Sequence, residues 1–162
     1  MHLPLAHQTL ARAQRMLDDL SRHADDEVAF RDRLPYVLDL LAGVTRCIES
    51  ESKGSRTTQF SDWWKAADRT MQAAIHELRN AELKRAESRT EAQVKVEMIP
   101  PGPQPVSMDA HPLTASQFSI VVSTDWRFTG GGLDGKPVLP ALAQYWNDVS
   151  GILAKAEALL GA

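Results

Sequence analysis

The stretch that most constrains the fold runs from Phe60 to Arg85 and contains neither proline nor glycine. Its apolar residues recur at alternating intervals of three and four, as Phe60, Trp64, Ala67, Met71, Ala74, Ile75 and Leu78. This spacing places them along one face of an α-helix. We therefore predict one continuous helix over residues 60–85, roughly 37 Å long, around which the other elements pack.

Three further segments have helical periodicity. They cover about residues 4–23, 28–50 and 140–160. Pro35 lies within the second segment, and proline cannot donate a backbone hydrogen bond to a helix. We therefore expect that helix to begin near Arg33 or Leu34, after a short separate turn. The last segment is expected to end at Gly161, a residue common at helix C-termini.

Between the predicted central and last helices the apolar spacing changes to strict alternation. Val94, Val96 and Met98 alternate with Lys95 and Glu97, and a β-branched segment, Phe118–Thr124, follows. Such alternation is typical of strands with one wet face. We predict an antiparallel hairpin over about residues 92–129, joined by a proline-rich loop at 100–112. Because an isolated two-stranded hairpin is marginal in water, it must lean on a helix or on a partner chain.

Composition limits the class of protein. The chain has 162 residues, a formal net charge of −3 and a single cysteine, Cys47, so an intramolecular disulfide is excluded. No apolar run approaches the roughly 20 residues that span a bilayer. We see no secretory signal, and we expect a cytoplasmic protein without membrane contact. The fold class predicted is mainly α: one domain, 1–162, built as a four-helix up-and-down bundle with the two-stranded hairpin inserted before the last helix.

Recognisable catalytic and metal-binding motifs are missing from the sequence. The five histidines show no HExxH or other paired-ligand spacing, so we predict no metal site. The glycines at 130–132 precede Lys136 with the wrong spacing for a phosphate-binding loop, and no nucleophile motif is present. We accordingly expect no cofactor.

One short motif suggests a family. The triplet Leu78–Arg79–Asn80 lies near the end of the predicted central helix, downstream of the aromatic pair Trp63 and Trp64 and followed by a late aromatic helix. In this the chain resembles the HEPN superfamily (higher eukaryotes and prokaryotes nucleotide-binding domains). The resemblance implies a helical bundle, often a homodimer, that binds RNA or nucleotide. Many such proteins are metal-independent ribonucleases of toxin–antitoxin and phage-defence systems.

The sequence departs from the family at one position. The family motif continues with a histidine four to six residues after the arginine, whereas Lys84 and Arg85 stand in this window here. A lysine can hold a phosphate, but with an ordinary pKa near 10.4 it is a poor general base at neutral pH. His76, three and four residues before Arg79 and Asn80, shares their helix face and is the candidate substitute.

These residues yield two functional hypotheses. The first is a HEPN-like protein of a prokaryotic or phage defence or toxin-type system, catalytically degenerate, with Arg79, Asn80 and His76 as its reactive set and Arg79, Lys84 and Arg85 binding nucleic acid. The second is a non-catalytic helical protein that acts through oligomerisation or a protein partner. On that second hypothesis Arg79, Asn80 and Lys84 form an ordinary solvated helix face, and the tryptophans pack in the protein rather than stack on bases. The missing histidine argues against an enzyme.

Overall fold

The computed structural model describes residues 1–67, 69–81, 89–99 and 119–161. Its elements, in chain order, are α1 (Pro4–Arg22), α2 (Glu27–Ser52), α3 (Thr58–Ala66), α4 (Thr70–Asn80), β1 (Thr90–Ile99), β2 (Ser119–Phe128), the short 3₁₀ helix η2 (Gly131–Leu133) and α5 (Val138–Gly161). The prediction of a mainly helical chain with an antiparallel hairpin before the last helix is confirmed. The four-helix up-and-down arrangement is not confirmed, since the described residues form five α-helices.

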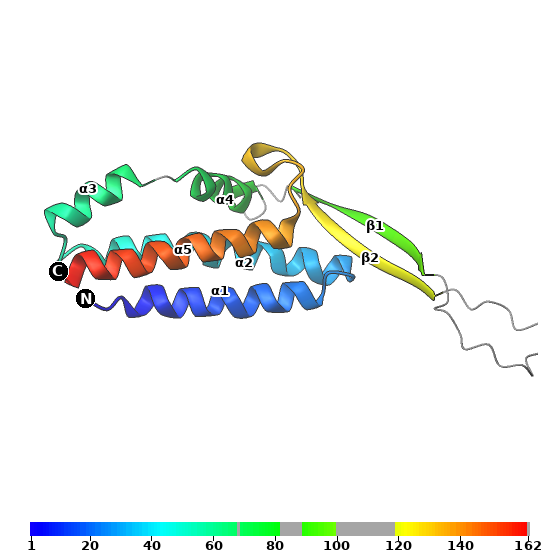
Figure 1. Ribbon diagram of the computed structural model, residues 1–162, viewed down its shortest axis with the longest axis horizontal. Helices are drawn as coiled ribbons and strands as arrows, with labels where there is room; N and C mark the ends of the chain where they lie inside the picture. The colour runs from blue at the N-terminus through cyan, green and yellow to red at the C-terminus, as the bar shows by residue number, and fades with distance from the viewer. Residues whose placement is uncertain (68, 82–88, 100–118, 162) are drawn as a thin grey trace, which may run out of the picture.

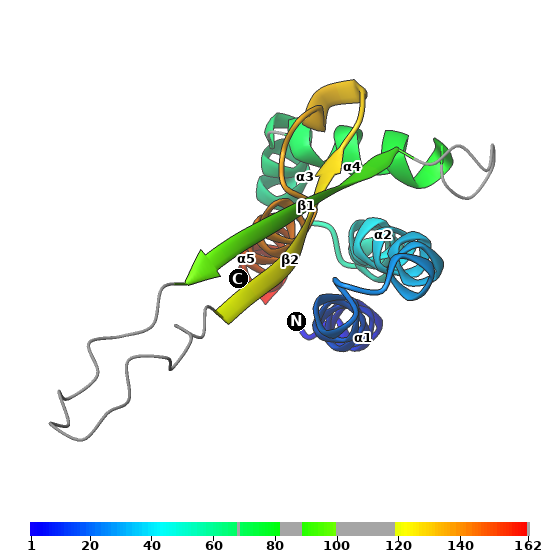
Figure 2. The ribbon, with the colours of Figure 1, turned by 90° about the vertical axis from the view of Figure 1, so that its right-hand side faces the viewer.

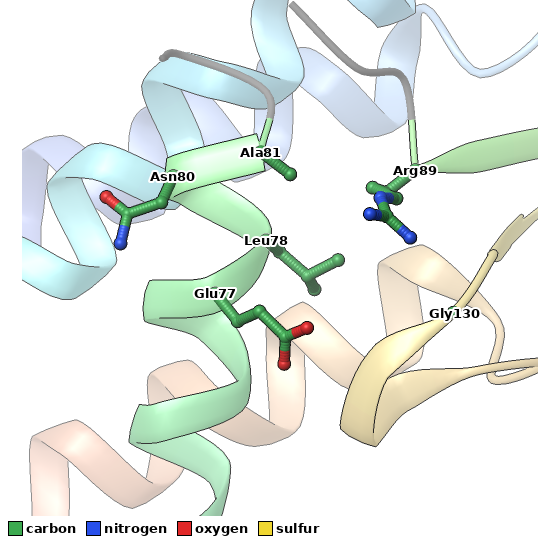
Figure 3. Close-up of a pocket in the computed structure, with 6 residues that line it drawn as sticks. All are labelled: Glu77, Leu78, Asn80, Ala81, Arg89 and Gly130. Carbon is green, nitrogen blue, oxygen red and sulfur yellow. The ribbon is translucent and has the colours of Figure 1, made fainter. Parts of the chain in front are cut away.

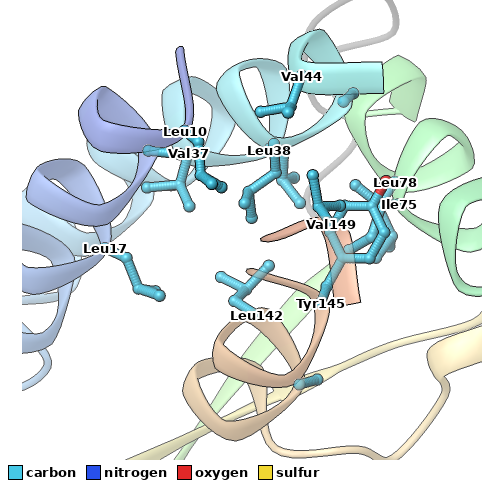
Figure 4. Close-up of a cluster of buried hydrophobic side chains, with 14 of the residues drawn as sticks. Leu10, Leu17, Val37, Leu38, Val44, Ile75, Leu78, Leu142, Tyr145 and Val149 are labelled. Atoms are coloured by element: carbon cyan, nitrogen blue, oxygen red, sulfur yellow. The ribbon is translucent and has the colours of Figure 1, made fainter. Parts of the chain in front are cut away.

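The three long helices form the body of the molecule. α1 runs antiparallel to α2 and α5, and the two chain termini lie beside each other at one end (Figure 1). α1 packs against α2 and α5, α4 packs against α2, and α3 packs against α5. Figure 4 shows the shared core, to which α1, α2, α4 and α5 all contribute; among its fully buried members are Val37, Leu38, Ile75, Leu142 and Val149.

The prediction of one continuous helix over residues 60–85 is wrong. α3 ends at Ala66, and the backbone at Ala67 is extended, with φ −62° and ψ 134°. The guanidinium of Arg69 donates to the Trp64 carbonyl at 2.7 Å and lies 4.5 Å from the centre of the Trp64 ring. In a continuous helix that carbonyl would accept the amide four residues later, so the arginine side chain stabilises the C-terminus of α3 instead. At the N-terminus of α3, the Thr57 side-chain oxygen accepts the Phe60 amide at 3.0 Å and caps the helix.

The second helix begins earlier than predicted. α2 starts at Glu27 and continues through Pro35 without a break, so the expected start near Arg33 or Leu34 is wrong. Its N-cap is Asp26, whose carboxylate accepts the Ala29 amide at 2.9 Å. Burial explains why the helix includes the proline, because Phe30 and Leu34 on the early turns and Val37 after it are all buried in the core. Tertiary packing of this apolar face offsets the local cost of proline.

The hairpin is anchored at its base and projects from the helices at its outer end (Figures 1 and 2). β1 and β2 pair antiparallel, with Val94 opposite Thr124, Val96 opposite Val122 and Thr90 opposite Phe128. At the base, the Trp126 ring stacks on Phe30 of α2 at 4.3 Å between centroids, with the planes 7° apart. The predicted proline-rich loop, 100–112, lies outside the described residues.

The N-terminus of α1 is capped by side chains from other helices. α1 has no side-chain cap of its own. Instead both carboxylate oxygens of Glu51, at the end of α2, accept the backbone amides of Leu5 and Ala6, at 3.0 and 2.9 Å. Glu157 of α5 accepts the Leu3 amide at 2.8 Å. Negative charge at a helix N-terminus also complements the helix dipole, so these two glutamates fix the start of α1 against the rest of the bundle.

Tyr145 provides a test of the core. Its ring is 1 % exposed, and its hydroxyl is buried without a hydrogen-bond partner among the described residues. A buried, unsatisfied polar group costs about 1–3 kcal/mol, so we expect Tyr145→Phe to raise the free energy of unfolding by about 1 kcal/mol. Urea unfolding followed by far-UV circular dichroism measures the change. Tyr36→Phe is the control, because Tyr36 is 64 % exposed and its loss of a hydroxyl should have no measurable effect. A loss of stability in Tyr145→Phe would contradict the prediction.

Candidate functional site

Arg79, the central residue of the predicted motif, forms an ion pair with a residue of another helix of the same chain. Its Nε and Nη2 lie 2.8 and 2.7 Å from the same carboxylate oxygen, Oδ1 of Asp39 on α2. The side chain of Arg79 is 21 % exposed and that of Asp39 is 42 % exposed. The contact joins α4 to α2, so part of the charge of Arg79 is already compensated within the chain.

The neighbours of this pair form a small polar cluster, which we call the Arg79 cluster: Asp39, Arg46, His76, Arg79 and Asn80. Arg46 of α2 donates to the same Asp39 oxygen at 3.3 Å. Arg79 also donates to the Asn80 side-chain oxygen at 3.3 Å. Two guanidinium groups and one carboxylate leave one net positive charge. The structure therefore brings His76, Arg79 and Asn80 to one place on α4, as their spacing predicted.

His76 has an altered acidity in this cluster. Its partial burial, and then the positive charges of Arg46 and Arg79, lower its pKa from the ordinary 6.5. All of these effects disfavour the protonated ring. His76 is thus neutral at pH 7, the protonation state that a general base or a hydrogen-bond acceptor needs.

The lowered pKa predicts how stability depends on pH. The unfolded chain protonates His76 below about 6.5, whereas the folded protein resists this protonation, so the contribution of His76 to stability is lost as the pH falls through this window. Glutamine is neutral at every pH in this range. We therefore expect the free energy of unfolding of His76→Gln to fall less than that of the wild type when the pH is lowered from about 7.5 to below about 6.5. Urea unfolding at a series of pH values measures both slopes. Equal slopes in the two proteins would show that the ring is protonated as easily in the folded state as in the unfolded state.

A cavity lies beside the cluster, but Arg79 does not line it. It measures about 110 Å³ and is bounded by Glu77, Leu78, Asn80, Ala81, Arg89 and Gly130. Figure 3 shows the Glu77 carboxylate and the Arg89 guanidinium facing the glycine turn, while the Asn80 amide points away from them. Pockets that hold small organic ligands measure about 300–1,000 Å³, so this one is too small for a nucleotide.

The turn beside this cavity, at residues 130–132, requires glycine at two positions. Gly130 and Gly131 both have positive φ, 76° and 70°. A Cβ on Gly130 would lie 2.8 Å from an Arg89 nitrogen, and one on Gly131 would lie 3.2 Å from the Glu77 carboxylate. Glycine is needed here for its backbone conformation and for the close approach of these charged side chains. The turn therefore packs against α4 and against Arg89, the residue before β1.

Two of the predicted nucleic-acid-binding residues, Lys84 and Arg85, lie outside the described residues. The tryptophans, which were candidates for stacking on bases, are mostly buried. Trp64 is 8 % exposed and donates from Nε1 to Glu49 at 3.1 Å. Trp126 is 3 % exposed. Of the adjacent pair, therefore, Trp64 packs inside, and only the half-buried Trp63 keeps part of its ring accessible, with the Lys155 ammonium 5.4 Å from its centre.

Two features of functional interest were not predicted. Asp39, the partner of Arg79, is 40 positions away in the sequence. His2, His7 and Glu157 come together at the ends of α1 and α5, with their nitrogen and oxygen atoms within 4.8 Å of one another. No local spacing joins either set, because each depends on which helices pack together.

The comparisons with known proteins identify no relative. The chain matches no protein-family model, no curated protein and no solved structure. Among the described residues, no helix is both long enough and apolar enough to cross a membrane.

Proposed function

We propose that this chain is a non-catalytic helical interaction protein that binds a second copy of itself through the outer half of its hairpin. The observation that carries the proposal is an apolar hairpin face that continues past the helices covering its base. We call it the valine face: Val94, Val96 and Val122.

The two faces of the hairpin differ sharply. The even-numbered residues of both strands share one face, which includes the buried Trp126 and Phe128 at the base. Further out, the same face carries the valines, which are 63 %, 62 % and 57 % exposed. The opposite face carries mainly polar residues, among them Glu91, Gln93, Lys95, Glu97, Ser123, Asp125 and Arg127. Among the residues that the structure describes, none buries the outer half of this apolar face, although its base is covered.

A second copy of the chain is the occupant that this face suits. Two identical hairpins packed face to face each supply the same apolar side chains, as a two-fold symmetric contact requires. Their charged faces would stay in water, and two sheets pack at about 10 Å with interdigitated side chains. A four-stranded sandwich of this kind also supplies the support that a two-stranded hairpin lacks by itself. The contact would continue the apolar surface that starts at Trp126.

Two valines on adjacent positions and opposite faces give a matched test. Val122 belongs to the valine face, whereas Val121, which is 44 % exposed, lies on the polar face opposite Glu97. Placing an unpaired charge in an apolar interface costs about 3 kcal/mol or more. Because a two-fold dimer contains this substitution twice, we expect Val122→Lys to raise the dimer dissociation constant by more than about a hundredfold. Val121→Lys should leave it within a few-fold of the wild type.

Sedimentation equilibrium over a range of protein concentrations measures the association, and circular dichroism confirms that each variant is folded. A wild type that stays monomeric throughout, or equal effects of the two substitutions, would refute self-association through this face. If the wild type is a monomer but forms a stable complex with a different protein, the chain is still an interaction protein, and only the proposal that its partner is a second copy is refuted.

A second candidate function rests on the Arg79 cluster. We propose as the alternative that the chain is HEPN-like and binds RNA or nucleotide there, with any ribonuclease activity reduced or lost, in a prokaryotic or phage defence or toxin-type system. In its support, Arg46, Arg79 and the neutral His76 lie together and leave one net positive charge beside Asp39. A bound phosphate would have to compete with the Asp39 carboxylate for both arginines.

This competition gives the alternative its own test. On this hypothesis Arg79→Ala weakens binding of a short single-stranded RNA, and Asp39→Asn strengthens it by releasing both guanidinium groups. Arg12→Ala, on the exposed side of α1, is the charge-matched control and should change nothing. Fluorescence anisotropy with labelled RNA measures the affinities, and gel electrophoresis of the RNA reports cleavage. If neither Arg79→Ala nor Asp39→Asn differs from the control, the cluster does not bind RNA.

A further inference from the structure

Two histidines and a glutamate meet where the chain termini lie together. His2 precedes α1, His7 is in its first turn, and Glu157 is near the end of α5. The antiparallel packing of α1 on α5 brings these distant positions side by side (Figure 1). The terminal amine also lies 3.4 Å from the Glu157 carbonyl oxygen, so the backbone of the two ends is in contact.

The three side chains converge on one atom. His2 Nδ1 and His7 Nε2 each lie 3.0 Å from Oε1 of Glu157. The two imidazole rings are stacked, with centroids 4.7 Å apart and planes 29° apart. The Leu3 amide donates to the same oxygen at 2.8 Å and orients the carboxylate. The two imidazole nitrogens and the Leu3 amide therefore meet at one carboxylate oxygen.

We propose that His2, His7 and Glu157 bind a divalent transition-metal ion of the zinc class, with the remaining coordination positions open to water. Two imidazole nitrogens and one carboxylate oxygen form a known donor set for zinc with an open position. Nitrogen ligands favour zinc, cobalt, nickel or copper over magnesium and calcium, which prefer oxygen.

The spacing of the donor atoms suits such an ion. Metal–ligand bonds of about 2.0–2.1 Å in a tetrahedron separate the ligand atoms by roughly 3.3 Å. The two nitrogen–oxygen distances are already 3.0 Å, and all three donor atoms lie within 4.8 Å of one another. His2 is 71 % exposed in its side chain and precedes the helix, so it can close the remaining distance without disturbing α1. The Leu3 amide hydrogen bond supplies the second-shell support that orients a ligating carboxylate.

The bound ion would join the N-terminal end of α1 to the C-terminal end of α5. Because these ends come from opposite ends of the chain, the unfolded chain does not hold the three ligands together. Metal binding should therefore stabilise the folded state. This gives two independent readouts, the affinity for the metal and the rise in melting temperature.

The test titrates zinc, and then cobalt, into the untagged full chain. Calorimetry should give one zinc ion per chain, and cobalt should develop the visible absorption of a low-coordinate site. Loss of a residue that merely supports a ligand costs about 10–100-fold in metal affinity, so His2→Ala and Glu157→Gln should each weaken zinc binding at least about tenfold. His23→Ala, at the opposite end of α1, is the control and should bind zinc as the wild type does.

Glu157→Gln could weaken zinc binding by loosening the start of α1, since Glu157 also accepts the Leu3 amide. His2→Ala does not share this problem, because His2 is exposed and lies outside the helix. Zinc should raise the melting temperature of the wild type and of His23→Ala, and leave that of His2→Ala almost unchanged. The proposal is overturned if the wild type does not bind zinc, or if His2→Ala binds it as tightly as the control. In either case the cluster is a set of hydrogen bonds between α1 and α5.

Discussion

Replacing Trp126 by alanine should lower the free energy of unfolding by about 3–5 kcal/mol, the range for removing a large aromatic side chain from a core. Trp126 is 3 % exposed and stacks on Phe30. Its Nε1 donates to the Ala24 carbonyl at 2.7 Å, and the Arg31 guanidinium lies 5.2 Å from the centre of its ring. The side chain therefore anchors the hairpin to the start of α2. Urea unfolding, followed by far-UV circular dichroism, measures the loss.

Trp126→Phe separates stacking from hydrogen bonding. It keeps an aromatic ring against Phe30 but removes the donor to Ala24, so we expect a loss of about 1–2 kcal/mol. Hydrogen exchange of the β1 and β2 amides in Trp126→Ala would show whether the hairpin leaves the helices before the bundle unfolds. A loss below about 1 kcal/mol in Trp126→Ala, with unchanged exchange in the hairpin, would contradict the anchoring role.

Pro35→Ala should have the largest stabilising effect, about 2 kcal/mol. Pro35 lies inside α2, where it cannot donate to the carbonyl four residues earlier and its ring crowds that turn. A proline in a helix interior lowers the free energy of unfolding by about 3 kcal/mol. Proline also restricts the unfolded chain, which offsets up to about 1 kcal/mol of this loss. Alanine should therefore raise the urea midpoint of unfolding without changing the slope of the transition.

Pro4 provides the control for this substitution. It occupies the start of α1, where a missing amide hydrogen is harmless. Pro4→Ala should change stability by only a few tenths of a kcal/mol. If Pro35→Ala destabilises the protein instead, the shape that Pro35 gives to α2 is required for its packing on α1 and α4. The free energy of that packing then exceeds the local cost of the proline.

The two proposed contacts, the valine face and the metal site, lie at opposite ends of the molecule. The hairpin leaves the bundle at the end opposite the two chain termini (Figure 1). Substitutions at the two sites should therefore act independently. A change in dimerisation caused by zinc would indicate a coupling between them.

The sequence by itself determined the elements whose cause is local. Helical spacing predicted α1 and α5, strict alternation predicted β1, and a run of β-branched residues predicted β2. The same spacing placed His76, Arg79 and Asn80 together on α4. These patterns are readable because they depend on residues within a few positions of one another.

Only the tertiary structure decided the rest. The apolar spacing continues from α3 into α4, yet α3 ends at Ala66 because α3 packs on α5 and α4 packs on α2. Burial of Phe30 and Val37 holds α2 together through Pro35, against the local preference of proline. Asp39 and Arg79 are 40 positions apart, and His2 and Glu157 are 155 apart. Such partners are fixed by which helices pack together, and the free energy of that packing outweighs the local preferences that a sequence pattern reports.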